Sequence, residues 1–463
     1  MKRNKILAVL FFASSMTFAL TQEELLEKLH QNNADIIKAE SDYMQACLDL
    51  KDAKGGLGPT IDMQISGTYM VNPPIGEVSV GAEELVSILS LNGYTIPLTM
   101  PVQDNNSVVL YEGMEHTLYQ FQLTLTQPVF TWGKLTNAIK LYEEVAGIRL
   151  NQKNDLIRKK EIELLTRETA LYFILQIEKI LDEESNYTKR LIEISQAYEK
   201  NGLLLKQDVL NARMQAQEVD VAKKKVQREK EIQIIEIQKL LSEEIDLSEI
   251  SFIPDEKKLS RFLSLTRSNV EEAAIDQENS QMKILSALVE TATLAKKIAD
   301  ASVYWKPDIA LQSSIGYTGQ RFPWIQEDWN DYGKYSLNFS LGIRTTVWDG
   351  GKAIRNVKRK EDDLNKARSQ YDDSVTQIKL AAATAYSDMT LAESKWQYQK
   401  LLIENDDMNL KRHESEYKAG YGSEIDLLKA KIQKLTDTIT SYQLETDMYV
   451  NCLTLDYLTG GRL

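Results

Sequence analysis

The sequence predicts an α+β fold made of two similar halves, each combining amphipathic strands, a long helix and a shorter return helix. Three observations predict it: a motif set recurs 218 positions later, two long stretches lack proline, and four segments alternate apolar and polar residues. So long a repeat indicates duplication of half a molecule. The recurring residues are Gly133-Lys134, Gly202, Asp208, Leu210 and Ala212, which return as Gly351-Lys352, Gly420, Asp426, Leu428 and Ala430.

The first segment, residues 1–19, is typical of a cleavable secretory signal. A basic start is followed by the short apolar run Ile6–Phe12 and by small residues up to Ala19. The run is shorter than the ~20 residues that a membrane-spanning helix needs. Its removal leaves 52 basic and 68 acidic residues, and an exported chain this acidic is a poor partner for nucleic acid.

The long helices are expected where proline is absent, between Pro128 and Pro254 and after Pro323. Each would span on the order of 100 Å, at ~1.5 Å per residue, and end at a glycine turn before a shorter helix runs back. Apolar residues in the second return helix follow three-four spacing, which is typical of a coiled-coil seam. The predicted bounds are 132–200 and 205–243 in the first copy, and 352–418 and 423–458 in the second.

A shorter helix is expected before the strands of each copy, at about Gln22–Ala53 and Val270–Ala301. A short helix and a return helix together match the length of one long helix, so we expect them to stack end to end beside it. The whole chain then divides into a first repeat at 20–243, a linker or equatorial segment at 244–267, and a second repeat at 268–463.

Four strands are predicted, at about 60–71, 117–130, 307–318 and 335–348. One face of each is apolar and the other polar, which fits both a membrane barrel and a half-buried soluble sheet. The signal segment, the long polar loops and the aromatic residues at the strand ends favour the membrane. Because four strands cannot close a barrel, other copies of the chain must complete it. The aromatic residues are Phe130, Trp132, Tyr304, Trp305, Trp324, Trp329, Tyr332, Tyr335 and Trp348.

Enzymatic chemistry is not expected. The three histidines have no metal-ligand spacing, and no nucleophile elbow or phosphate-binding glycine loop is present, so we predict no catalytic residue, cofactor or metal. Cys47 and Cys452 either pair as terminal helices come together or pack as separate buried thiols.

The duplicated order of elements and the two turn motifs resemble the TolC-like outer-membrane efflux channels over nearly the whole mature chain. The turn motifs run from Tyr198 to Ala212 and from Tyr417 to Ala430. The resemblance implies a homotrimer with a twelve-stranded β-barrel in the lipid of the outer membrane, four strands coming from each chain. It also implies a helical coiled-coil tunnel through the periplasm. The implied function is passive conduction of substrates, in tripartite efflux or type I secretion, from an inner-membrane efflux or ABC transporter and a periplasmic adaptor to the exterior.

The resemblance also implies roles for the helical tips. Gly202, Asp208, Gly420 and Asp426 would dock the adaptor, and Asp426 would gate the periplasmic entrance. The sequence differs from the family pattern at two positions near this entrance. Lys429 stands where a second acidic residue can occur, and Gly422 stands where a basic latch is found.

Local structure offers another interpretation of the same tip residues. Ser423 and Asp426 have the spacing of a capping box, and an acidic first turn complements the helix dipole at both sites. The glycines at the two turns would simply supply a positive φ. A non-channel periplasmic adaptor or scaffold protein therefore remains the alternative function.

Overall fold

The computed structural model describes residues 21–81, 84, 107–111, 113–244, 252–303, 305–320 and 332–462. The predicted signal segment, part of the linker, and the aromatic residues Tyr304, Trp324 and Trp329 lie outside these ranges. The chain divides into two compact units, and each draws on both halves of the sequence. A helical unit contains Met1–Leu48, Glu143–Ala292 and Asp363–Leu463, and a unit with the sheet contains Asp49–Tyr142 and Thr293–Asp362.

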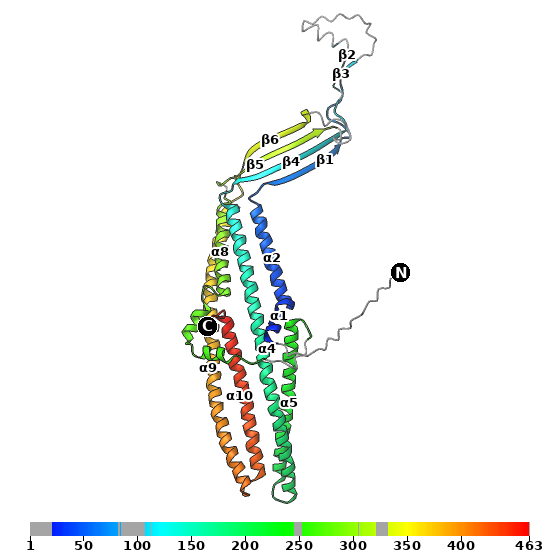
Figure 1. The fold of residues 1–463 in the computed structure, drawn as a ribbon. Helices are drawn as coiled ribbons and strands as arrows, with labels where there is room; N and C mark the ends of the chain where they lie inside the picture. Colours follow the sequence, from blue (N-terminus) through cyan, green and yellow to red (C-terminus); the bar gives the residue numbers. More distant parts are fainter. Residues whose placement is uncertain are drawn as a thin grey trace, which may run out of the picture. The chain divides into compact units, whose positions relative to one another are not determined.

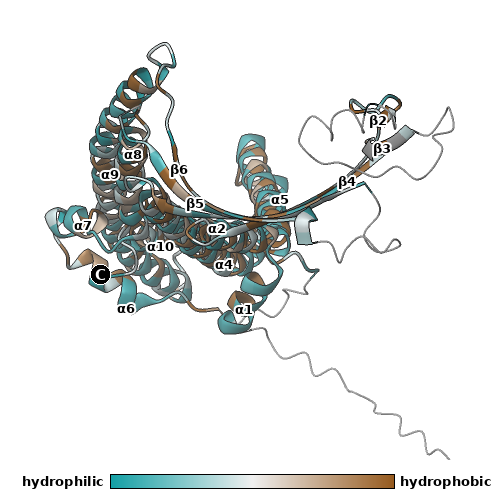
Figure 2. Cartoon of the chain, turned by 90° about the horizontal axis from the view of Figure 1, so that it is seen from above, coloured by the Kyte–Doolittle hydropathy of each residue, from teal (hydrophilic) through white to brown (hydrophobic). Residues whose placement is uncertain are grey.

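The second unit is built around a four-stranded antiparallel sheet with the order β1-β4-β5-β6 (Figure 1). The four strands curve together as one layer (Figure 2). A separate two-stranded sheet, β2-β3, lies in the long loop that follows β1. The strands are β1 (Thr60–Tyr69), β2 (Val78–Gly81), β3 (Ser107–Tyr111), β4 (Thr117–Phe130), β5 (Asp308–Gly319) and β6 (Tyr335–Arg344), with a 3-10 turn at Tyr332–Lys334 before β6.

The register gives this sheet one apolar and one polar face. Residues paired across antiparallel strands share a face, so each set of paired residues can be followed through all four strands. The apolar sets are Ile65, Phe121, Tyr317 and Tyr335, then Met63, Leu123, Ile315 and Leu337, then Ile61, Leu125, Ser313 and Phe339. The polar sets between them are Gln64, Gln122, Gly316 and Ser336, then Asp62, Thr124, Ser314 and Asn338.

The strands end where pairing or backbone geometry stops them. β6 ends at Arg344, which pairs with Asp308, the first residue of β5. The sequence-based strand continued to residue 348. After β4, Trp132 and Gly133 adopt left-handed φ values of 53° and 81°, so the long helix begins at Lys134.

The helical unit contains two long hairpins, α4-α5 and α9-α10 (Figure 1). Four helices, α2, α4, α8 and α9, have residues in both units. The helices are α1 (Gln22–Asn32), α2 (Ala34–Gly55), α4 (Lys134–Lys200), α5 (Lys206–Leu241), α6 (Glu256–Leu263), α7 (Arg267–Ala274), α8 (Ser280–Asp300), α9 (Lys352–Lys418) and α10 (Glu424–Leu458).

Apolar clusters join these helices at successive levels. One cluster packs α1 and the start of α2 against α4 and α5, and includes Leu29, Leu164 and Leu241. A second packs α6 and α7 against α9 and α10, and includes Phe262, Met389 and Met448. Two more join α4, α5 and α10 toward the turns. The return helix α10 is therefore held on α4 as well as on α9.

Each repeat contains a helix break that the sequence patterns did not predict. Asn33 separates α1 from α2, and its side chain accepts from the N–H of Asp35 and donates to the carbonyl of Leu240, 2.7 Å away, near the end of α5. Asn279 acts in the same way before α8, donating to the carbonyl of Leu458 at 2.9 Å. Both asparagines are buried, and their partners are 218 positions apart.

Candidate functional site

The candidate site consists of the two turns that end the long hairpins. At the first, the N–H of Leu203 donates to the carbonyl of Tyr198 at 2.9 Å; at the second, that of Tyr421 donates to Glu416 at 3.2 Å. Gly202 and Gly420 adopt φ values of 73° and 84°. This is the Schellman arrangement, in which a left-handed residue lets the chain satisfy the last helical carbonyls and turn back. The two predicted glycines thus have the same role, because each supplies the left-handed residue that ends a long helix.

The second turn is tighter than the first. A Cβ placed on Gly422 would lie 2.6 Å from the backbone nitrogen of Tyr417 and 2.7 Å from the carbonyl carbon of Glu416. The N–H of Gly422 also donates to the carbonyl of Glu416 at 2.9 Å. A side chain at this position would require the turn to move. A basic latch residue at this position would therefore not fit the turn as it is built here.

The two acidic tip residues have different surroundings. The Asp208 carboxylate accepts from the N–H of Leu205 at 3.0 Å and so caps the first turn of α5. Ser423 caps α10 through its hydroxyl, which accepts from the N–H of Ile425 at 3.1 Å, and no return bond from Asp426 completes the box. Within the described part of the chain, the exposed Asp426 carboxylate has no hydrogen bond or ion pair. The expected capping box is therefore absent, while Asp208, without a serine before it, makes the acidic half of one.

Behind the turns, α10 is fixed to the first hairpin. Ile425, Leu428 and Ile432 are buried against residues of α4 and α5. Arg190 of α4 contacts Glu424 with Nε and Oε1 3.1 Å apart, and this contact raises the pKa of the Arg190 guanidinium. The N-terminal end of α10, which carries Asp426, is therefore anchored on α4.

The surface of the tips is apolar to an unusual degree for solvated turns. Leu203 and Leu205 are about 70% exposed, and Tyr421 is 78% exposed. Leu210 and Met214 continue the exposed apolar surface along α5. Exposed apolar groups that cluster in this way are typical of a protein interaction surface.

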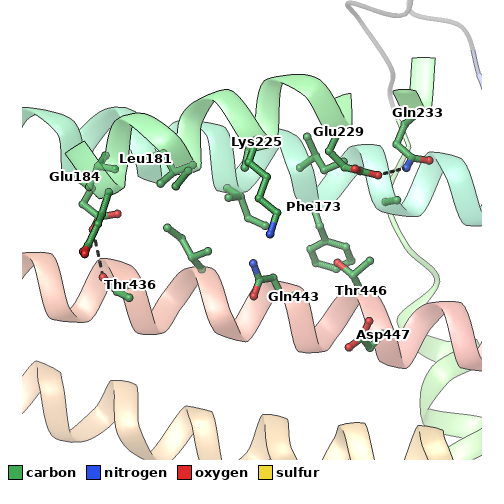
Figure 3. Close-up of a pocket in the computed structure, with 18 of the residues that line it drawn as sticks. Phe173, Leu181, Glu184, Lys225, Glu229, Gln233, Thr436, Gln443, Thr446 and Asp447 are labelled. Atoms are coloured by element: carbon green, nitrogen blue, oxygen red, sulfur yellow. Dashed lines mark hydrogen bonds between the residues drawn. The ribbon is translucent and has the colours of Figure 1, made fainter. Parts of the chain in front are cut away.

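A groove that the sequence patterns did not predict runs between α5 and α10, with α4 as its floor, and has a volume of about 620 Å³. Phe173 and Leu181 of α4 form part of the apolar floor, while Lys225 reaches from α5 toward Gln443 of α10 (Figure 3). Glu184 accepts from the hydroxyl of Thr436 at 3.2 Å near one end. The one sequence signal was the change from apolar to polar residues in the seam of α10 near Thr446.

Among the described residues, no group of His, Cys, Asp and Glu side chains is arranged to hold a metal ion. Cys47 and Cys452 are separate free thiols, and burial raises the pKa of the Cys452 thiol to about 12, which keeps it protonated. The described helices include none that is long and apolar enough to cross a bilayer.

Comparison with known proteins shows a likeness to outer-membrane efflux proteins. Residues 274–461 match the model of the family described as outer membrane efflux protein. The resemblance to TolC-like channels is thereby confirmed, and the family is one of channels rather than enzymes. No curated protein matches the chain.

Solved structures show the same fold over nearly the full chain. A membrane protein from Pseudomonas aeruginosa is 13% identical with a TM-score of 0.72, covering 95% of this chain and 93% of that one. CusC is 14% identical with a TM-score of 0.72, covering 96% and 94%. The outer membrane protein VceC from Vibrio cholerae is 15% identical with a TM-score of 0.70, covering 95% and 96%. The mostly helical α+β fold is therefore that of outer-membrane channel proteins.

Proposed function

We propose that this protein is the outer-membrane channel of a tripartite efflux or type I secretion system. Three copies would form a twelve-stranded barrel in the outer membrane, and their helical hairpins would form a coiled-coil tunnel in the periplasm. Within each copy, the repeats at 20–243 and 268–463, joined by the segment 244–267, would give two similar but unequal tips. Substrates would pass from an inner-membrane efflux or ABC transporter, through a periplasmic adaptor, to the exterior.

The observation that carries this proposal is the incomplete sheet with its exposed apolar face. β1 and β6 are edge strands of the four-stranded sheet, so their outer backbone groups require partners in a lipid environment. Met63, Phe339 and Leu341 on the apolar face are each more than 60% exposed. Pairing β6 of one copy with β1 of the next would satisfy the edges and place the apolar face against lipid.

The tips support the expected contacts with a periplasmic adaptor. Gly202 and Gly420 shape the turns, and Asp208 caps α5, so these residues would position the exposed leucines and tyrosine for docking. Asp426 is exposed on the anchored end of α10. In a trimer, three such carboxylates would concentrate cations at the periplasmic entrance and contribute to gating.

A planar-bilayer experiment on the detergent-purified protein tests the proposal. A homotrimer by mass should conduct with a preference for cations, and Asp426→Asn should reduce that preference severalfold because it removes three charges from one ring. Asp208→Asn is the matched control, since this carboxylate is occupied in capping. A folded trimer without conductance would overturn the channel assignment.

The same preparation distinguishes the periplasmic scaffold alternative. A scaffold should remain in solution without detergent, and it should produce no conductance at any protein concentration. Equal effects of the two substitutions would contradict the assignment of Asp426 to the entrance while leaving the channel itself in place.

A further inference from the structure

The two halves of α9 are held to the rest of the helical unit in different ways. At its middle, residues including Ala382 and Met389 are buried in an apolar cluster with α10. From residue 393 to the turn at 418, Gln399 is the only buried residue that the structure describes. Tyr398 and Met408 are each about 60% exposed. Trp396 packs against the edge of the apolar cluster and donates from Nε1 to Glu445 of α10 at 2.8 Å. Below Trp396, the contacts described between the lower half of α9, residues 393–418, and α10 are polar.

At the centre of these contacts, two carboxyl groups face each other. The side chain of Asp406 on α9 is in hydrogen-bonding contact with Asp437 on α10. Asp437 also accepts from the amides of Gln433, at 2.7 Å, and Gln399, at 2.8 Å. The Asp406 Oδ2 atom is buried, and no donor of the described chain reaches it. Because two ionised carboxylates only accept, the contact is a hydrogen bond only if one of them carries a proton.

The surrounding charges determine which carboxyl carries the proton. Burial raises the pKa of Asp406 to about 6, aided by the bond to Asp437 and by the negative charges of Asp437 and Asp407, against the opposing charge of Lys434. Lys434 is itself paired with Asp407 at 2.6 Å.

Asp437 responds in the opposite direction. Burial acts to raise its pKa, but the donors from Gln433, Asp406 and Gln399 outweigh burial and hold the pKa below its usual range. On the α4 side, the acidic Glu184 accepts from Thr436, the residue before Asp437. The proton therefore resides on Asp406, and Asp437 is the accepting carboxylate.

We propose that Asp406 and Asp437 form a proton-sharing clasp that closes the lower half of α9 onto α10, and that loss of the shared proton to water releases α9. In the protonated state the O–H of Asp406 donates to Asp437. After deprotonation two carboxylates repel each other across the helix pair. Combined with the proposed channel function, on which this step rests, release would loosen the second hairpin near the entrance.

The direction of the pH dependence follows from the two states of Asp406. In the closed hairpin its pKa is about 6, and in a released, solvated hairpin it returns toward 3.8. The closed form thus keeps a proton that the open form loses, so closure is favoured at low pH. Because proton binding and closure are thermodynamically linked, the ratio of open to closed hairpin rises about tenfold between about pH 5 and about pH 7.5.

Hydrogen–deuterium exchange of the full-length protein in detergent measures this release directly. After correction for intrinsic exchange chemistry, amides of residues 393–418 should exchange about tenfold faster at about pH 7.5 than at about pH 5. In Asp406→Asn the new amide donates to Asp437 at both pH values, so the ratio should fall to about 1. Asp437→Asn provides a second variant, which should also abolish the pH dependence.

Asp407→Asn is the matched control, because it removes a neighbouring acid and its ion pair but leaves the facing carboxyls. Because the charge of Asp407 contributes part of the raised pKa of Asp406, this variant should weaken the pH dependence without abolishing it. A wild-type ratio near 1, persistence of the dependence in Asp406→Asn, or its loss in Asp407→Asn would each overturn the clasp. Conductance measured on the same samples separates the two proposals: a pH-dependent hairpin in a non-conducting trimer contradicts the channel, and a conducting trimer with pH-independent exchange contradicts the clasp.

Discussion

The two long hairpins of the helical unit are closed by different kinds of contact. Between α4 and α5, apolar residues are buried at every level, from Leu164 and Leu241, through Leu181 and Val219, to Leu191 near the turn. Between α9 and α10, the buried apolar residues of α9 are confined to positions 382–392, with the partly buried Trp396 packed below them. From there to the turn, the described contacts are side-chain amides, carboxyls and the ion pair of Lys434 with Asp407.

This difference means that the first hairpin mainly provides stability, whereas the lower half of the second can respond to pH. Apolar packing contributes free energy that does not depend on pH, whereas paired carboxyls gain or lose attraction as they titrate. The first hairpin, with α10 anchored on it, is therefore suited to be the fixed element, and the lower half of α9 to be the element that moves. Glu168 complicates this division, because it is a buried carboxyl in the apolar hairpin.

Glu168 provides the largest expected effect on the stability of the first hairpin. It is fully buried on α4, neither carboxyl oxygen has a hydrogen-bond partner among the described residues, and burial raises its pKa from 4.5 to about 8. The folded state therefore retains a proton that the unfolded chain loses. Its contribution to the free energy of unfolding is lost as pH rises from about 4.5 to about 8, a change of at most about 5 kcal/mol.

Glu168→Gln removes this titration, so the variant should be more stable than wild type at about pH 8.5 and similar to it at about pH 5. Urea unfolding at both pH values measures the difference. Glu178→Gln on the same helix is the control, since Glu178 is part-exposed and paired with Lys230. An identical pH dependence in wild type and Glu168→Gln would show that Glu168 does not make the stability of the first hairpin depend on pH.

The second prediction compares truncation in the two hairpins. Leu181→Ala deletes a buried side chain between α4 and α5 and should lower the free energy of unfolding by about 2–5 kcal/mol. Gln399→Ala removes the buried amide that bonds Asp437 and should cost about 1–3 kcal/mol. Denaturant titration gives both values. If Gln399→Ala cost as much as Leu181→Ala, the lower half of α9 would be as firmly held as the first hairpin.

The features visible in the sequence were those set by local chemistry. Glycine at 202 and 420 marked both turns because few other residues accept a positive φ, and period-two alternation marked the two faces of the sheet. The breaks at Asn33 and Asn279 were not visible, because their partners are more than 170 residues away.

The details of the candidate site were the least predictable. Ser423 and Asp426 have the spacing of a capping box, yet it is Asp208 that returns a bond to the backbone, because side-chain rotamers decide the outcome and spacing does not. Asp406 and Asp437 meet only through the register of α9 against α10, which no local pattern encodes. The requirement for glycine at 422 likewise appears only once the turn is built.

The smallest expected effect compares the two turns themselves. Alanine at Gly202 would meet no atom within 4 Å, so its cost is that of a left-handed residue, about 1 kcal/mol. Alanine at Gly422 would place its Cβ against the backbone of Glu416 and Tyr417, and relieving that overlap should cost about 1–3 kcal/mol.

Amide exchange at the two turns can measure both losses of stability within one molecule. Gly202→Ala should raise exchange only at the first turn, whereas Gly422→Ala should also loosen the end of α9, because Glu416 accepts the bonds of both Tyr421 and Gly422. Equal and purely local effects would mean that the second turn is no tighter than the first, and that the loose half of α9 is controlled by its contacts with α10 alone.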